Sequence, residues 1–234
     1  MQDINYKNIS ILSDFDGTIT LTDTINKFLD IFADKSWLYI EEQWKRGEIG
    51  SQICLQKQFD LIPKLTDSQI NNFCDDIKID ESFLEFYSFI KENNIPFAIV
   101  SDGFDFFIEK ILKKNNLFGI KIYSNNLYID DNGKFKVSFI QNNLSCKVKS
   151  ANCKCQVLDL YKKSNNYVMY IGDGLSDVCI SGKVDILFAK NYLANYCKEK
   201  NIKYIEYNRF EDIRRIIARK GINYGEYSSE NVIG

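Results

Sequence analysis

The chain has 234 residues, a net charge of -2, seven cysteines and no histidine. Without histidine, Ser-His-Asp and Cys-His catalysis, histidine-ligated zinc and phosphohistidine chemistry are all excluded. The small net charge gives no general attraction to nucleic acid or to a membrane. Acid–base chemistry must therefore come from Asp, Glu, Lys, Tyr or Cys side chains.

The chain starts MQDINYKNIS, without the basic and apolar regions of a signal peptide, and it has no apolar run of membrane-spanning length. We therefore expect a cytoplasmic protein with reduced thiols. Cys146, Cys153 and Cys155 are interpreted as structural thiols, because a clear fourth zinc ligand is lacking. No cysteine is followed by arginine six residues later and no GxxxxGK[ST] loop occurs, so neither a cysteine phosphatase nor a P-loop NTPase is supported.

An apolar run from Ile9 to Leu12 predicts a buried strand that ends at two carboxylates, Asp14 and Asp16, followed by Gly17. Side chains at i and i+2 of an extended segment point the same way, so both carboxylates can project from the carboxyl end of this strand. Two like charges in one place are unfavourable unless a cation or a reaction uses them. This stretch is therefore the first candidate site.

Helical patterns fill the long interval between this strand and the next one. The interval from Asp14 to Ser101 exceeds the about 30 residues of a plain strand–helix–strand unit. We expect a helical cap at 23–79, inserted after the first strand into a catalytic core of residues 1–22 and 80–234. The helices are expected from a cap at Thr22 or Asp23 to Phe32, and at 37–46, 51–60, 66–76 and 80–93.

Strands and helices alternate through the rest of the chain, which predicts an α/β fold. We expect a Rossmann-like, mostly parallel sheet with helices on both faces. In such sheets ligands bind beyond the carboxyl ends of the strands. Strands are expected at 97–100, 120–123, 127–129, 135–140, 167–171, 186–189 and 204–206, with a hairpin turn at 131–133, and helices at 104–114, 152–163, 176–181, 192–200 and 210–220.

The polar groups at three strand ends suit phosphoryl transfer. A magnesium ion held by the hard oxygen ligands of Asp14 and Asp173 would offset the repulsion between a carboxylate and a phosphate monoester. Asp14 would then attack phosphorus, while Asp16 protonates the leaving oxygen and later deprotonates water. Lys154 and the Ser101 hydroxyl would hold the remaining phosphate oxygens.

Three neighbouring residues complete the predicted site. Backbone N–H groups around Gly103 would face the phosphate. The N–H of Asp102 can do the same, but its carboxylate must point away. Asp177 would orient either the water shell of the metal or Lys154.

These motifs resemble those of the haloacid-dehalogenase-like (HAD) phosphatases. SDFDGTIT, which contains Asp14 and Asp16, is similar to their first motif; Ser101, Lys154 and the GDGLSD stretch at 172–177 are similar to the second, third and fourth, in the same order. The resemblance implies a Rossmann-like core, Mg²⁺, the roles given above, and metal contacts from Asp14, Asp16 and Asp173. The helical insertion resembles the cap of the phosphoserine phosphatase branch.

Within that branch, Asp23-Thr24, residues 44–49 and Cys153-Lys154 are similar to the methionine-salvage phosphatases. This similarity implies a small phosphorylated metabolite, a methylthio enol phosphate, as the substrate. A phosphoserine-phosphatase-like enzyme and a phosphotransferase would use the same residues. An inactive regulatory protein on this fold is the alternative from another class.

Some candidate residues also have a structural interpretation. Trp37 and Trp44 are seven residues apart, which predicts a packed helix stripe more than a substrate contact. Arg46 is expected to be solvated or, alternatively, to reach the substrate from the cap. Lys147 and Lys149 are the competitors of Lys154 for the phosphate-binding role.

Overall fold

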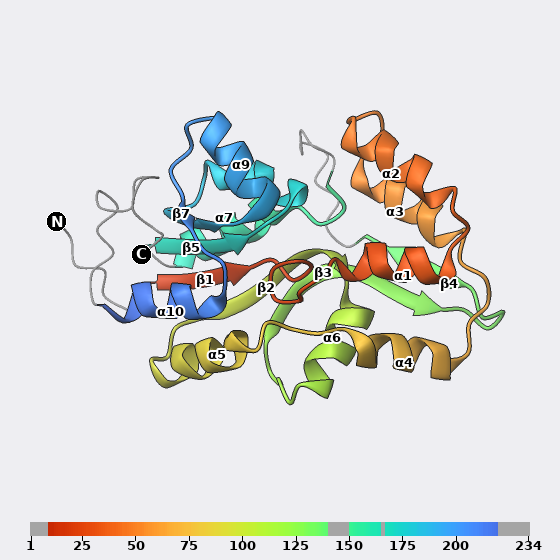
Figure 1. Ribbon diagram of the computed structural model, residues 1–234, viewed down its shortest axis with the longest axis horizontal. Coiled ribbons are helices and arrows are strands. Elements are labelled where there is room, and N and C mark those ends of the chain that lie inside the picture. Colours follow the sequence, from red (N-terminus) through yellow and green to blue (C-terminus); the bar gives the residue numbers. More distant parts are fainter. Residues whose placement is uncertain (1–8, 140–149, 165–166, 220–234) are drawn as a thin grey trace.

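The computed structural model describes residues 9–139, 150–164 and 167–219, and their centre is a seven-stranded sheet (Figure 1). The strand order is β4-β3-β2-β1-β5-β6-β7. Neighbouring strands are parallel except β3 and β4, which pair antiparallel. The strands are β1 (Ile9–Ser13), β2 (Phe97–Phe104), β3 (Lys121–Ile129), β4 (Phe135–Ser138), β5 (Tyr167–Gly172), β6 (Ile186–Ala189) and β7 (Ile205–Glu206).

Helices cover both faces of the sheet, which confirms the predicted Rossmann-like α/β class (Figure 1). Alternation along β1 places Ile9 and Ile11 in the larger apolar cluster and Leu12 in the smaller one, on the opposite face. α5 (Ser82–Glu92), α6 (Asp105–Lys114) and α10 (Phe210–Ala218) cover the first face; α7 (Lys154–Ser164), α8 (Val178–Ser181) and α9 (Asn191–Glu199) cover the second.

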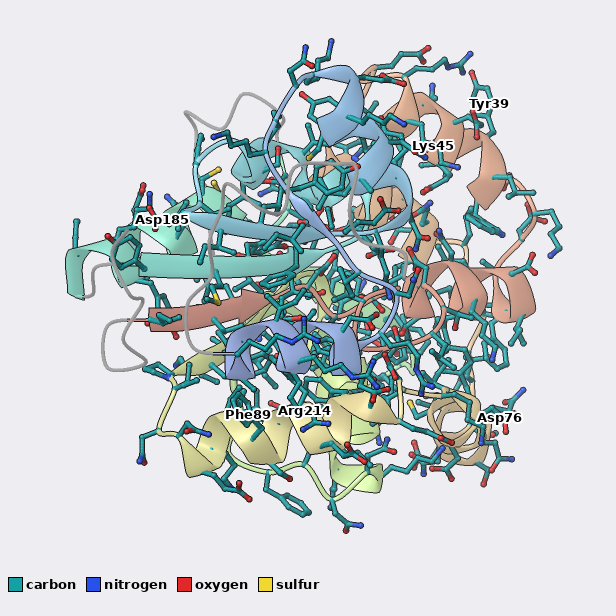
Figure 2. The ribbon with its side chains drawn as sticks, turned by 60° about the vertical axis from the view of Figure 1, so that its left-hand side comes forward. Tyr39, Lys45, Asp76, Phe89, Asp185 and Arg214 are labelled. Atoms are coloured by element: carbon teal, nitrogen blue, oxygen red, sulfur yellow. The ribbon has the colours of Figure 1, made fainter. Side chains whose placement is uncertain are left out.

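Aromatic side chains on the first face pack α10 against α5. α10 lies along α5, and Figure 2 shows the two helices with Phe89 and Arg214 labelled. The ring of Phe210 on α10 lies 4.9 Å from Phe83 and 5.1 Å from Phe86, measured between centroids. Ring pairs at such distances add stabilisation beyond simple burial. These contacts therefore stabilise the packing of α10 against the core.

Two predicted strand boundaries were wrong. β2 continues past Val100 to Phe104, and β3 is one strand where two were expected. The polar middle of β3 stays in the sheet because the buried Asn125 amide donates to the backbone oxygens of Asp102 and Gly103, at 2.7 and 3.2 Å. The hairpin turn was predicted correctly, with Gly133 at φ 77°.

The expected cap helices are all present. The two chain segments that join them to the core run side by side, since Thr20 and Ile79 form an antiparallel bridge. The Leu21 N–H donates to Lys78 O at 3.0 Å. The four helices are α1 (Thr24–Phe32), capped by the Asp23 side chain, α2 (Trp37–Lys45), α3 (Ser51–Phe59) and α4 (Asp67–Asp76), which begins with the predicted capping box.

An aromatic cluster joins the base of these helices to the core. The Phe28 ring on α1 lies 4.7 Å from Phe107 on α6 and 4.9 Å from Phe73 on α4. Phe59 on α3 lies 4.7 Å from Phe104 at the end of β2. In Figure 1, α2 and α3 lie side by side above α1, and α3 also contacts β4. The domain boundary at 23–79 stays a prediction, but the cap has a packed attachment to the core.

Among the described residues, none of the helices combines the length and the apolar character that a membrane crossing requires.

Candidate active site

The end of β1 directs its side chains to alternate sides. Phe15 is fully buried in the core, so Asp14 and Asp16 on either side of it face the cleft. Asp14 is only 4% exposed, and its carboxylate accepts the Phe15 N–H at 2.8 Å. Gly17 follows at φ 73°, and a Cβ there would lie 2.6 Å from Asp173 Oδ2. Glycine is therefore required for both the turn and the approach of Asp173.

Lys154 crosses the base of the site from the first residue of α7. Its ammonium lies 3.1 Å from Asp14 Oδ1 and 2.5 Å from Asp177 Oδ1, and it donates to Ser176 Oγ at 3.1 Å. Burial alone would lower the pKa of Lys154, but these two carboxylates raise the pKa above its usual value. The fully buried side chain therefore stays charged and faces the predicted nucleophile.

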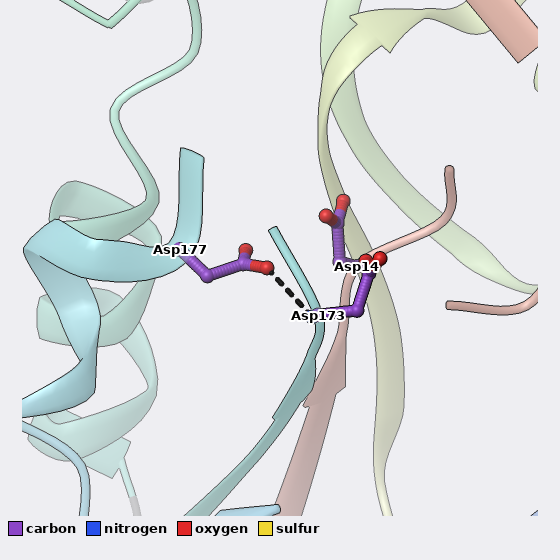
Figure 3. Close-up of side chains that lie close together, drawn as sticks. All are labelled: Asp14, Asp173 and Asp177. Atoms are coloured by element: carbon purple, nitrogen blue, oxygen red, sulfur yellow. Dashed lines mark hydrogen bonds between the residues drawn. The ribbon is translucent and has the colours of Figure 1, made fainter. Parts of the chain in front are cut away.

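Asp177 holds Lys154 in place. One carboxylate oxygen receives the Lys154 ammonium and the Tyr170 hydroxyl, each at 2.5 Å. The other oxygen accepts the N–H groups of Asp173 and Gly174, each at 3.0 Å (Figure 3). Of the two roles predicted for Asp177, these contacts favour the orientation of Lys154.

The acidic groups at the strand ends fit a divalent cation. Oxygen atoms of Asp14, Asp173 and Asp177 all lie within 4.8 Å of one another (Figure 3). Burial, followed by the charge of Asp177, raises the pKa of both Asp14 and Asp173; Lys154 offsets part of this shift at Asp14. Hard oxygen donors with uncompensated negative charge suit Mg²⁺. Asp14 and Asp173 line the cavity whereas Asp177 does not, so Asp14 and Asp173 are the residues that would hold the ion.

Asp16 is connected to the second motif. Its carboxylate accepts the Thr24 N–H at 3.1 Å and the Ser101 hydroxyl at 3.3 Å. Burial raises the pKa of Asp16, and the hydrogen bonds from Thr24 and Ser101 offset part of that rise. A raised pKa suits a general acid. The metal contact assigned to Asp16 stays a prediction.

The turn after Ser101 is close to Asp16 as well. The Gly103 N–H donates to Ser101 Oγ at 2.9 Å, and a Cβ at position 103 would lie 2.7 Å from Asp16 Oδ2. The Asp102 carboxylate accepts the Asn152 N–H at 2.6 Å. The Asn152 amide in turn donates to Ser101 O at 2.9 Å. Asn152 was missed in the sequence, although its position two residues before Lys154 was a signal.

A cavity of about 330 Å³ lies over these groups and is lined on the cap side by Glu41, Trp44, Ser51, Cys54, Leu55 and Gln58. The prediction of a packed stripe holds for buried Trp37 but was wrong for Trp44, which lines the cavity. Glu41 and Trp44 come four and seven residues after Trp37 and therefore share one face of the helix. The acidic Glu41 on this otherwise apolar stripe was the available signal that the stripe lines a cavity.

Glu41 and Gln58 form a polar pair in the cap. Glu41 is buried and accepts the Gln58 amide at 3.0 Å. Arg46 lies at the surface instead, where it pairs with Glu48 at 3.1 Å. Lys147, Lys149 and Cys146 lie outside the described residues.

Comparisons with known proteins agree with this geometry. Residues 9–208 match the family model described as "Putative Phosphatase". The chain is 29% identical over 216 residues to "2-hydroxy-3-keto-5-methylthiopentenyl-1-phosphate phosphatase" of Bacillus velezensis, which covers 90% of each chain. It is 30% identical over 211 residues to the Bacillus pumilus protein of the same name, over 87% of this chain and 88% of that one.

Solved structures show the same fold. "Phospho-Aspartyl Intermediate Analogue of Phosphoserine phosphatase" has a TM-score of 0.67 at 23% identity, over 91% of this chain and 98% of that chain. "Substrate bound phosphoserine phosphatase complex structure" has a TM-score of 0.66 at 21% identity, with the same coverage. The chain therefore belongs to the Putative Phosphatase family and is a phosphatase of the haloacid-dehalogenase-like fold.

Proposed function

We propose that the protein hydrolyses a small phosphate monoester in a Mg²⁺-dependent reaction, through an aspartyl phosphate on Asp14. The position of the Asp14 carboxylate carries this proposal. It lies at the base of the cavity, 3.1 Å from the buried Lys154 ammonium and beside Asp173. A carboxylate opposite a fixed cation, with a place for a divalent ion, suits attack on a phosphate dianion.

The residues divide the reaction between them. Bound by Asp14 and Asp173, Mg²⁺ would neutralise charge on the phosphate oxygens. Lys154, the Ser101 hydroxyl and the Gly103 N–H hold the phosphoryl group while Asp14 forms the new bond to phosphorus. Asp16 gives its proton to the departing oxygen of the substrate.

The second half-reaction uses the same groups in reverse. Asp16, now ionised, takes a proton from a water molecule, and the water oxygen attacks phosphorus. The bond between phosphorus and Asp14 breaks, which releases inorganic phosphate and restores both carboxyl groups. The hydrogen bond from the Thr24 N–H keeps Asp16 at one position through both steps.

We infer that the substrate is 2-hydroxy-3-keto-5-methylthiopentenyl-1-phosphate, the compound in the names of the Bacillus relatives. The cavity suits an uncharged leaving group with an apolar tail, because Ile25, Trp44 and Leu55 line it beside the Glu41–Gln58 pair. Among the described residues that line the cavity, none is lysine or arginine. The carboxylate of phosphoserine would therefore face Asp23 and Glu41 with no cationic partner among the described lining residues, which disfavours phosphoserine.

Hydrolysis of p-nitrophenyl phosphate with Mg²⁺ or with EDTA tests the reaction. Turnover should require the metal and be abolished by Asp14→Asn, while Asp76→Asn at the exposed end of α4 should leave it unchanged (Figure 2). Turnover that survives Asp14→Asn would contradict the mechanism. A panel that contains the methylthio enol phosphate and phosphoserine tests the substrate, and faster hydrolysis of phosphoserine would overturn that assignment.

The remaining alternatives make different predictions in the same assays. A phosphotransferase would show less free phosphate than p-nitrophenol when an acceptor alcohol is added, whereas a hydrolase releases both equally. An inactive binding protein would show no metal-dependent turnover. The catalytic groups of the proposed reaction are all present, which speaks against inactivity. Lys154 pairs with Asp14, Ser101 donates to Asp16, and Asp173 lies beside Asp14.

A further inference from the structure

Two cysteines lie directly behind the active-site loops and have no role in the proposed reaction. Cys155 follows Lys154 in the first turn of α7, and Cys179 in α8 comes three residues after Ser176. The Cys155 sulfur lies 3.3 Å from the Cys179 backbone oxygen, so the two residues are in contact where α7 packs against α8. The pair therefore links the loop that carries Lys154 to the loop that carries Asp177.

Cys155 also has a cationic partner. The Lys183 ammonium lies 3.2 Å from the Cys155 sulfur, and Lys183 itself is exposed. Hydrogen bonds from Cys179 and Lys183 outweigh burial and lower the pKa of Cys155 to about 6. A thiolate is the reactive form of cysteine, and both a neighbouring lysine and a position at the start of a helix stabilise it.

The other cysteines with shifted pKa values move in the opposite direction. Burial raises the pKa of Cys54 to about 12 and that of Cys74 to about 11. The pKa of Cys197 is also raised by burial. None of the six described cysteines forms a disulfide. Within the described chain, Cys155 therefore has the strongest thiolate character among these four.

We propose that Cys155 is a peroxide-reactive thiol, and that its oxidation joins it to Cys179 in a disulfide that displaces Lys154 and inactivates the enzyme. Both thiols are half-buried, and the Cys155 sulfur already contacts the backbone of Cys179, so a small reagent can reach them and a short movement is enough. Geometry thus supplies a reactive thiolate, a resolving thiol and a catalytic residue next to them.

The chemistry needs only hydrogen peroxide. The Cys155 thiolate attacks one peroxide oxygen; an S–O bond forms, the O–O bond breaks, and hydroxide leaves and gains a proton to become water. The Cys179 sulfur then attacks the Cys155 sulfur; the S–S bond forms, the S–O bond breaks, and the hydroxyl leaves with the thiol proton as a second water. The two cysteines lose two electrons and the peroxide gains them.

The disulfide would act on catalysis through Lys154. An S–S bond of about 2.05 Å requires the two sulfurs to move closer than hydrogen-bond contact allows. The move shifts the first turn of α7 against α8, while Lys154 is held between Asp14 and Asp177 at 3.1 and 2.5 Å. A displacement of about 1 Å at a catalytic group can cost roughly 10²-fold in rate.

Intact-mass spectrometry after peroxide treatment tests the modification without any assay of activity. The wild-type protein should lose two hydrogens, and peptide mapping should find Cys155 linked to Cys179. Cys179→Ser should instead gain one oxygen on Cys155, and Cys155→Ser should show neither change. Oxidation of another cysteine at the same rate in Cys155→Ser would overturn the proposal.

Lys183→Gln provides a variant that keeps both cysteines and removes only the cationic partner of Cys155. Its iodoacetamide reaction at Cys155 should be roughly tenfold slower than in the wild type, because less thiolate is present near pH 7. The control is Lys163→Gln, on the exposed side of α7, the helix that carries Cys155. Cys155 in this variant should react as it does in the wild type. Equal rates in all three proteins would refute the role of Lys183 in activating the thiol.

Inhibition by the disulfide rests on the proposed phosphatase activity and is measured separately, as turnover of p-nitrophenyl phosphate. Peroxide should reduce p-nitrophenyl phosphate turnover at least tenfold in the wild type, dithiothreitol should restore it, and Cys155→Ser should be insensitive. A disulfide found by mass with unchanged turnover would refute the effect on Lys154. Absence of turnover before oxidation would instead refute the proposed function, and the mass readout would still decide the modification.

Discussion

Replacement of Lys154 by methionine is the most informative perturbation of the active site. Methionine fills most of the volume of the fully buried lysine, but it removes the charge between Asp14 and Asp177. Loss of one partner from a buried ion pair typically costs about 3–5 kcal/mol in the free energy of unfolding. We expect a loss in this range, reduced to the extent that Asp14 becomes protonated, since Lys154 lowers the pKa of that carboxyl.

The same variant should lose transition-state stabilisation. One preorganised donor typically contributes about 10²–10³-fold to kcat. Urea unfolding and p-nitrophenyl phosphate kinetics measure the two effects, with Lys163→Met on the exposed face of α7 as the control. In the double variant with Asp14→Asn, the destabilisation should be smaller than the sum of the single effects, because Asp14 then no longer adds a second unpaired charge to that of Asp177. A Lys154→Met protein with the stability and kcat of the control would refute this account of the site.

Three further predictions concern the same groups. Asp16→Asn should lower kcat by about 10²–10⁴-fold with little change in Mg²⁺ affinity, and an unchanged kcat would remove Asp16 from acid–base catalysis. Gly103→Ala should abolish turnover, because its Cβ would lie 2.7 Å from Asp16 Oδ2. Its circular dichroism spectrum should remain native. An active Gly103→Ala protein would show that the loop can move to accommodate the Cβ. Since the raised pKa values of Asp14 and Asp173 make the folded state bind more protons than the unfolded state, the metal-free protein should lose stability as pH rises through those values. Mg²⁺ should therefore raise Tm more at about pH 8 than at about pH 5, and an equal shift in calorimetry would contradict the metal site.

The strand ends were predictable because their physical signals are local. An apolar run followed by alternating carboxylates and glycine places Asp14 and Asp16 at the end of β1 without any knowledge of the fold. Strand–helix alternation then brings Asp173 and Ser101 to the same edge of the sheet. The order of the four motifs along the chain also indicated the resemblance to the haloacid-dehalogenase-like phosphatases.

The cap side of the cavity was not predictable in the same way. Trp44 has the spacing of a packed stripe, and only the position of α2 over the cleft makes it a lining residue. Glu41 and Gln58 meet across two helices, a long-range contact without a local sequence signal. Similarly, β3 remains one strand because Asn125 bonds to the end of β2, which overrides the weak strand propensity of its polar middle.

The surroundings of Cys155 could not be predicted from the sequence. The cysteine was interpreted as a structural thiol because a clear fourth zinc ligand is lacking, whereas its contacts with Lys183 and Cys179 depend on how α7 packs against α8. A hydrogen-bond partner 24 residues away and a charged partner 28 residues away in the chain set the environment of this thiol.

Trapping of the covalent intermediate tests the central claim most directly. Borohydride reduces an acyl phosphate to an alcohol, so an aspartyl phosphate at position 14 would be converted to homoserine. Enzyme mixed with substrate and Mg²⁺, quenched in acid, reduced and digested should carry this change at Asp14 in tandem mass spectrometry, and EDTA should prevent it. Turnover without any such change at Asp14, or the change at another carboxylate, would contradict the mechanism.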